Sequence, residues 1–198
     1  MIYIPNIITV LRILLVVPIG FLLWHNRHVD AFLLMVVAGL SDALDGWLAR
    51  RFGWLTKLGA TLDPLADKLL VAMVFVVFTV QGHIPLWIAI IVLSRDFIIV
   101  AGAGVYKLLY EEVDIAPTFL SKANTAMQLI VLILLIISLL PVGIASQISR
   151  AMVDPFGFYI LALLGVSSGI DYVITWGSKA YREGKKRRQY NHRFKQRG

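Results

Sequence analysis

The chain has 198 residues, of which 59% are hydrophobic and 16% are charged, and it carries a formal net charge of +7. A mean hydropathy of +0.78, together with so few charges, excludes an ordinary soluble domain and predicts one integral membrane domain. The chain has no cysteine, which is consistent with a reducing compartment without requiring one.

Six apolar stretches follow one another along the chain, and each is long enough to cross or nearly cross a bilayer. We expect all six to be α-helices, so the predicted fold is all-α: a polytopic integral membrane protein with six transmembrane helices. Residues 1–178 form the membrane domain and residues 179–198 a basic tail. The expected spans are 5–24, 31–50, 60–81, 85–108, 119–141 and 151–176.

The first stretch carries polar residues near its start. Arg12 interrupts the apolar run and no small-residue cleavage site follows, so we expect a retained helix and not a signal peptide. Asn6, Thr9 and Arg12 recur at a three-residue step, which brings them to one side of a helix. They either line a polar pocket or cap the helix end and extend toward water, and the spacing leaves both open.

Four aspartates in the second and third stretches follow a fixed rhythm. Positions i, i+3 and i+4 share a helix face, so each helix presents a row of carboxylates. A carboxylate near hydrocarbon is costly unless it faces a partner or a wet cavity, so the pattern predicts a cationic ligand. The full pattern is Asp42-x-x-Asp45-Gly46-x-x-Ala49-Arg50, eight residues, and Gly59-x-x-x-Asp63-x-x-x-Asp67.

The ligand that this pattern favours is a hard divalent cation. Oxygen ligands without Cys or His nearby suit Mg²⁺ or Mn²⁺, and these ions commonly bind substrate phosphates as well. Gly46 and Gly59 would leave room for a bulky molecule, and the Arg50 guanidinium suits a phosphate oxygen. Alternatively the aspartates only pair with neighbouring cations, but four carboxylates on two faces exceed what such pairing requires.

The complete string D-x2-D-G-x2-A-R-x8-G-x3-D-x3-D resembles the signature of the CDP-alcohol phosphotransferases, without a substitution. The likeness runs from about Pro5 to Leu129. It implies a polytopic membrane enzyme that transfers a phosphatidyl or similar group from a CDP-linked donor to an alcohol and releases CMP. It further implies a cofactor of two Mg²⁺ or Mn²⁺ ions, and it leaves open a homodimer.

The same resemblance implies a role for each signature residue. Asp42, Asp45 and Asp63 would be metal ligands, and Asp67 would be the general base as well as a metal ligand. The P-N-x-x-T-x-x-R start of the chain is also similar to that of family members. The residues implied in donor binding are Asn6, Thr9, Gly46, Ala49, Arg50 and Gly59.

Lysine and arginine are distributed unequally between the loops. With six spans, one side of the membrane receives fourteen of these residues and the other receives only Arg27 and Arg150. This bias places both termini and the aspartate site on the cytoplasmic side of the inner membrane, where CDP-linked donors are made. The basic tail could suggest a nucleic-acid arm, but a polybasic segment after a membrane helix is more typical of binding to anionic lipids.

The residues after the signature bear on the acceptor alcohol. Phosphatidylglycerophosphate synthases, which use glycerol 3-phosphate, typically show R-E-F, a second Arg eight residues after the first, and G-K-x-K-T. This chain has Ser94-Arg95-Asp96-Phe97, Ala103 and Ser121-Lys122-Ala123-Asn124-Thr125, so two expected cations are missing. S-R-D and the segment from Pro117 to Leu129 resemble cardiolipin synthases instead.

We therefore expect phosphatidylglycerol as the acceptor, with glycerol 3-phosphate as the alternative. Arg95 and Lys122 are the candidate acceptor-binding residues, although Arg95 could simply pair with Asp96. Asp67 would take the proton of the acceptor hydroxyl, which attacks the lipid-side phosphorus of CDP-diacylglycerol. A cation or proton transporter is the remaining class, but transporters typically show repeated halves and charges near the midplane, and neither is visible here.

Overall fold

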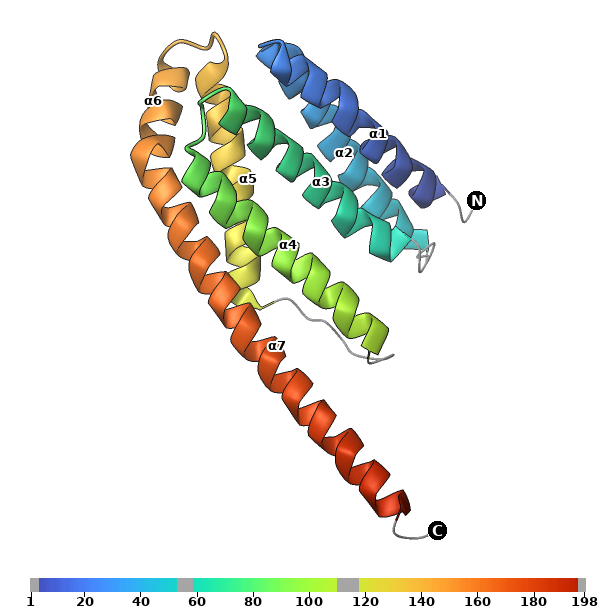
Figure 1. Ribbon diagram of the computed structural model, residues 1–198. Helices are drawn as coiled ribbons and strands as arrows, with labels where there is room; N and C mark the ends of the chain where they lie inside the picture. The colour runs from blue at the N-terminus through green and yellow to red at the C-terminus, as the bar shows by residue number, and fades with distance from the viewer. Residues whose placement is uncertain (1–3, 53–58, 110–117, 196–198) are drawn as a thin grey trace. The chain divides into compact units, whose positions relative to one another are not determined.

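The computed structural model describes the backbone of residues 4–52, 59–109 and 118–195, and every regular element in these ranges is helical. The all-α class is therefore confirmed for the described part of the chain. The elements are α1 (Ile4–Trp24), α2 (His28–Phe52), α3 (Gly59–Val80), α4 (Leu86–Leu109), α5 (Phe119–Leu139), α6 (Ile144–Met152), a π-helical turn η1 (Val153–Gly157), and α7 (Phe158–Lys195) (Figure 1).

The first five helices begin and end within three residues of the predicted stretches. The sixth stretch, predicted over 151–176, is divided, and this is a correction. At Asp154 the backbone leaves the helical region, with φ −110° and ψ 116°, because the residue before a proline disfavours that region. Beyond the break α7 continues to Lys195, so the basic tail is largely helical, in keeping with the high helix propensity of Lys, Arg and Gln.

Two helical segments of the described chain are long and apolar enough to cross a membrane on length and hydropathy alone. They are Phe119–Leu139 and Ile144–Thr175. Shorter apolar runs occur at Val10–Trp24 and His28–Ser41, where the polar residues of α1 and the aspartates of α2 limit the apolar length. The count of six spans therefore stays a prediction.

The helices form two compact units, each described by itself. The first comprises Met1–Ile90 with Leu129–Phe158. Here α1 packs against both α2 and α3, and the side chains that fill this interior, Ile19, Leu23, Val74, Phe75 and Phe78, have no exposed surface. In a bilayer such residues stabilise the fold through close packing, since lipid tails are as apolar as they are.

Two helices of the first unit end in the same way. Asn26 follows α1 with φ +57° and Gly82 follows α3 with φ +79°. After each left-handed residue the next amide donates back into the last turn, Arg27 to Leu22 and His83 to Phe78. This is the Schellman arrangement, and it explains why the chain has Asn and Gly, which tolerate positive φ, at these two positions.

The second unit comprises Ile91–Gln128 with Tyr159–Gly198. In it α4 and α7 approach closely where the Tyr172 hydroxyl donates to the Ile99 carbonyl at 3.1 Å. A Cβ on Gly102 would lie 2.7 Å from that hydroxyl, so only glycine allows this contact. The interior of this unit is unusually polar: counted over the whole residue, Arg95, Asp96, Asn124, Gln128 and Ser168 each have 9% or less of their surface exposed.

Candidate functional site

The signature lies on two helices of the first unit. Asp42 through Arg50 occupy the C-terminal half of α2, and Gly59 through Asp67 form the first turns of α3. Both helices pack against α1, as Figure 1 shows. Because both segments are helical, the predicted phase is confirmed: Asp42, Asp45 and Ala49 lie on one face of α2, and Gly59, Asp63 and Asp67 on one face of α3.

Most of the predicted site side chains lie outside the described residues. This holds for Asn6 and Thr9 on α1, for Asp42, Asp45, Ala49 and Arg50 on α2, and for Asp63 on α3. Among the described residues there is no group of three or more His, Cys, Asp or Glu placed to hold a metal ion. Metal ligation and donor binding by these residues therefore stay predictions, resting on helical phase and residue type.

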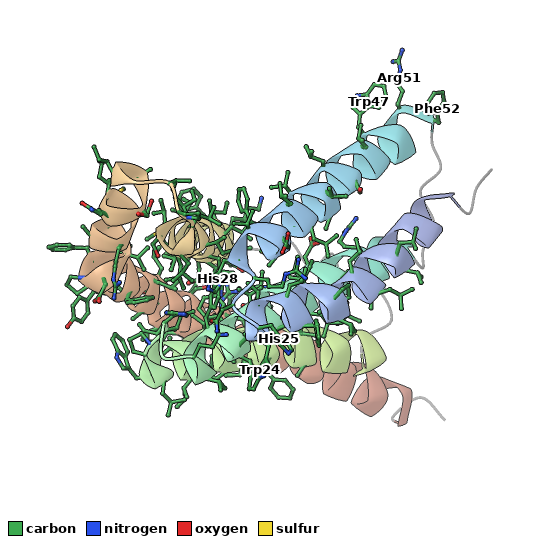
Figure 2. The ribbon with its side chains drawn as sticks, turned by 90° about the horizontal axis from the view of Figure 1, so that it is seen from above. Trp24, His25, His28, Trp47, Arg51 and Phe52 are labelled. Carbon is green, nitrogen blue, oxygen red and sulfur yellow. The ribbon has the colours of Figure 1, made fainter. Side chains whose placement is uncertain are left out.

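The far end of α2 is exposed around the signature. Trp47 and Phe52 are each 57% exposed, and Figure 2 shows them with Arg51 at the end of α2 remote from His28. Trp and Arg are typical of the membrane–water interface. From His28 to Trp47 the helix is roughly 29 Å long at about 1.5 Å per residue, and only its first part, His28–Ser41, is an apolar run.

Asp67 is the signature aspartate whose side chain the structure describes. Its carboxylate is 59% exposed, and Oδ1 lies 3.3 Å from Nη1 of Arg12. Arg12 is only 3% exposed, so its guanidinium reaches Asp67 from within the α1–α3 packing and does not extend toward water. Of the two alternatives for Arg12, this contact favours lining a polar pocket over capping the helix end and extending toward water. It also places a permanent positive charge beside the predicted general base.

A second polar cluster lies in the other unit and centres on Arg95. Its Nη1 donates to Asp96 Oδ1 at 2.7 Å, and its Nη2 donates at 2.7 Å to the hydroxyl oxygens of both Ser121 and Ser168. The side chains of Arg95 and Asp96 are 4% and 12% exposed. These contacts join α4, α5 and α7, and they satisfy a cation that would otherwise be costly to bury.

The predicted pairing of Arg95 with Asp96 is thus present, together with two serine partners that the sequence did not single out. Lys122, the other candidate acceptor residue, is exposed on α5 beside Ser121. The signal for the missed residues is the polar row Ser121, Asn124 and Gln128, at i, i+3 and i+7 of an otherwise apolar helix. Ser168 carries no comparable signal, because it is adjacent to Ser167 and two adjacent serines do not form a row on one face of α7.

Comparison with known proteins shows which family the chain resembles. Residues 2–167 match the family model described as CDP-alcohol phosphatidyltransferase. The human protein named cardiolipin synthase (CMP-forming) is 34% identical over 143 residues, which cover 64% of this chain and 48% of that protein. A Rickettsia prowazekii protein named CDP-diacylglycerol--glycerol-3-phosphate 3-phosphatidyltransferase is 31% identical over 172 residues, covering 85% of this chain and 92% of the relative.

A Mycobacterium tuberculosis protein named probable phosphatidylglycerophosphate synthase is 28% identical over 176 residues, covering 85% of this chain and 78% of that protein. The chain spans about half the length of the human relative. The family model, by contrast, covers most of the chain and includes all four signature aspartates. With this match and the unbroken signature on α2 and α3, the chain belongs to the CDP-alcohol phosphatidyltransferase family.

Proposed function

We propose that this protein is a membrane enzyme that transfers a phosphatidyl group from CDP-diacylglycerol to a glycerol-type hydroxyl and releases CMP. The observation that carries the proposal is the complete signature, held at helical spacing on α2 and α3. The family is membrane-bound, which agrees with the high hydropathy of the chain.

The carboxylate ligands that the signature offers fit a hard divalent cation. It consists of four carboxylates, and the described one, Asp67, is open to solvent. Two Mg²⁺ or Mn²⁺ ions held by Asp42, Asp45, Asp63 and Asp67 would neutralise the pyrophosphate of the donor and the charge of the departing CMP.

The residues of the chain supply binding and proton transfer. Asp67 takes the proton of the acceptor hydroxyl, whose oxygen bonds to the lipid-side phosphorus while the bond to CMP breaks. Arg12 holds the Asp67 carboxylate in place. The proposed transfer is a single displacement and needs no covalent intermediate. The residues proposed to bind the donor are Asn6, Thr9, Gly46, Ala49, Arg50 and Gly59.

Phosphatidylglycerol is the proposed acceptor, which would make the protein a cardiolipin synthase. Ala103 and Asn124 replace cations that a small dianionic acceptor would need, and the human relative bears this name. Arg95 and Lys122 are proposed to serve the phosphodiester. The hydroxyl oxygens of Ser121 and Ser168 accept from Arg95, so their protons can be donated to a phosphate oxygen.

Glycerol 3-phosphate is the second candidate acceptor. The observation that favours it is the Rickettsia prowazekii relative, which this chain matches over 92% of its length and whose name specifies that substrate. A homodimer stays a prediction for either acceptor.

An acceptor assay tests the proposal. Purified protein would be given CDP-diacylglycerol and Mg²⁺ with either phosphatidylglycerol or glycerol 3-phosphate, and CMP and the lipid product would be measured. We expect cardiolipin to form faster than phosphatidylglycerophosphate and a chelator to stop both reactions. Phosphatidylglycerophosphate without cardiolipin would overturn the acceptor assignment alone.

Asp63→Asn is the matched test of the metal site, and Asp30→Asn is its control. Removing the charge of a metal ligand should abolish CMP release. Asp30 instead forms an exposed ion pair with Arg27 at 2.7 Å, and such pairs contribute at most about 1 kcal/mol, so its variant should stay active. CMP release that resists the chelator would contradict the proposed chemistry as a whole.

A further inference from the structure

A small polar cavity lies in the first unit, beyond the end of α3 that is remote from the signature. It has a volume of about 90 Å³ and lies where the turn after α3, the end of α5 and the segment that follows α6 meet. From Asp67 to Val80, where α3 ends, the helix is roughly 20 Å long at about 1.5 Å per residue. The cavity is therefore separate from the proposed active site. Its polar lining residues are His83, Ser138, Arg150 and Asp154, all in the first unit.

The cavity contains two opposite charges that do not pair with each other. Arg150 and Asp154 are four residues apart, a spacing at which side chains on a regular α-helix can form an ion pair. The ion pairs between described residues include neither of them. The turn that contains Asp154 is π-helical, and the backbone leaves the helical region at this residue, so the α-helical spacing does not hold there. Both side chains are exposed, so a ligand from outside can reach them.

The polar groups of the cavity offer both donors and acceptors. The Arg150 guanidinium has only donors and a permanent charge, which suits a phosphate oxygen. Burial and then the charge of Arg150 lower the pKa of His83, so at neutral pH this ring is uncharged and one of its nitrogens can donate. Asp154 has only acceptors, and Ser138 uses its proton on the Leu135 carbonyl at 2.6 Å, so it too presents an acceptor. A ligand that satisfies all four groups carries an anionic phosphate and a cationic donor.

The helix that supplies the guanidinium has its apolar face on the outside. On α6, Ser149 is only 5% exposed, whereas Ile144, Ile148 and Met152, at successive turns, are more than half exposed. A helix at the surface of a soluble protein shows the reverse arrangement, so this face suits the acyl chains of a lipid. The apolar segment that α6 begins, Ile144–Thr175, has 32 residues, more than the ~20 that cross a bilayer core. Its amphipathic start can therefore lie at the membrane–water interface.

We propose that this cavity binds the headgroup of a phospholipid that carries both a phosphate and a primary ammonium group. The phosphate binds Arg150 and His83, the ammonium binds Asp154 and Ser138, and the acyl chains lie along the apolar face of α6. Because Arg150 and Asp154 are exposed, only part of the headgroup has to enter the cavity. The lipid stabilises the fold by joining α6 to the turn after α3. This inference does not depend on the proposed function, because the signature takes no part in it.

Thermal unfolding of the delipidated protein in detergent tests the inference. Phosphatidylethanolamine should raise the melting temperature by at least about 3 °C, because a ligand that binds only the folded chain stabilises it by mass action. Phosphatidylcholine with the same acyl chains should raise it by less than about 1 °C, because its trimethylated nitrogen has no proton to donate. Inorganic phosphate with free ethanolamine should have a similarly small effect, because neither compound has acyl chains to bury.

Variants of the two charged residues show whether the shift comes from this cavity. In Arg150→Gln and in Asp154→Asn the shift with phosphatidylethanolamine, measured against the same variant without lipid, should fall below about 1 °C. Arg150→Gln changes an exposed side chain on a regular helix, so it keeps the test valid if Asp154→Asn does not fold. Arg27→Gln is the matched control. It removes an exposed cation that pairs with Asp30 outside the cavity, so it should keep the wild-type shift.

Two results would overturn the proposal. Equal shifts with phosphatidylethanolamine and phosphatidylcholine, or a shift that Arg150→Gln leaves unchanged, would show a general effect of lipid and a cavity that holds only water. A full shift with inorganic phosphate and ethanolamine would show that the ligand is a soluble compound and not a lipid.

Discussion

At the scale of single residues, Arg12 shows how a buried cation can serve a site on another helix. Its side chain comes from α1 and ends at Asp67 on α3, 3.3 Å away. Arginine stays charged even when buried, so it needs a carboxylate partner, and Asp67 is mostly exposed on its other side. The contact therefore orients the carboxylate without covering it.

We predict that Arg12→Gln lowers kcat for CMP release at least tenfold, equivalent to about 1.4 kcal/mol in the barrier, while the KM for CDP-diacylglycerol changes little. Arg12→Lys should recover part of the rate, because it restores the charge but not the planar geometry. Steady-state kinetics on matched amounts of folded protein would check this.

Arg27→Gln is the control for Arg12, because Arg27 is 63% exposed and forms its ion pair with nearby Asp30. It should leave kcat within about twofold, as expected for a surface ion pair. A rise in KM with normal kcat in Arg12→Gln would instead assign Arg12 to substrate binding.

At the scale of elements, the turns that join α1 to α2 and α3 to α4 are packed together in the first unit. Gln81 Nε2 donates to the Leu23 carbonyl at 2.8 Å, and the rings of His28 and His83 lie edge to face, 6.2 Å between centroids. Phe78 contacts both rings. A small polar cavity of about 90 Å³ beside His83 is lined by Ser138, Arg150 and Asp154 among others.

This packing makes the turns sensitive to acid. Burial and then the neighbouring His83 lower the pKa of His28, and burial and then Arg150 lower the pKa of His83. The unfolded chain therefore binds more protons than the folded one just below the ordinary histidine pKa of 6.5. Stability is fully present above that pH and falls as the pH decreases toward the lowered values.

We accordingly predict that the melting temperature of the detergent-purified protein decreases between about pH 7 and pH 5, and that His28→Gln/His83→Gln flattens this dependence. Thermal unfolding at several pH values measures it. His25→Gln is the control, because its ring is exposed and bonds the Phe21 carbonyl one turn earlier in the chain. An unchanged slope in the double variant would show that other groups cause the acid sensitivity.

At the scale of the whole molecule, the predicted topology places both termini on one side of the membrane. The basis is the charge bias, with fourteen Lys and Arg on one side against Arg27 and Arg150 on the other. Figure 2 shows His28 and Trp47 toward opposite ends of α2, but the length of a helix does not determine its direction, so the orientation stays a prediction.

The chain has no cysteine, so single cysteines can report on topology without background. We predict that cysteines at Lys57 and Lys186 are protected from impermeant thiol reagents in intact cells and react after permeabilisation, whereas one at Arg27 reacts in both. Labelling at Lys186 before permeabilisation would reverse the orientation.

The sequence alone determined the class of the fold, the bounds of five helices and the phase of the four aspartates. These properties depend on local pattern: a long apolar run without internal polar partners must be helical in a bilayer, and spacing within one helix fixes which residues share a face. The break at Asp154 was missed, although Pro155 signals it, because the apolar run continues on both sides.

Only the tertiary structure decided which polar groups meet. Arg12 and Asp67 are 55 residues apart, and Arg95 and Ser168 are 73 apart. Pattern within a helix does not determine how that helix is rotated toward its neighbours, which depends on the packing of all side chains between them. For the same reason the sequence could name Asn124 as a departure from a motif, but only the tertiary structure shows that its side chain is completely buried.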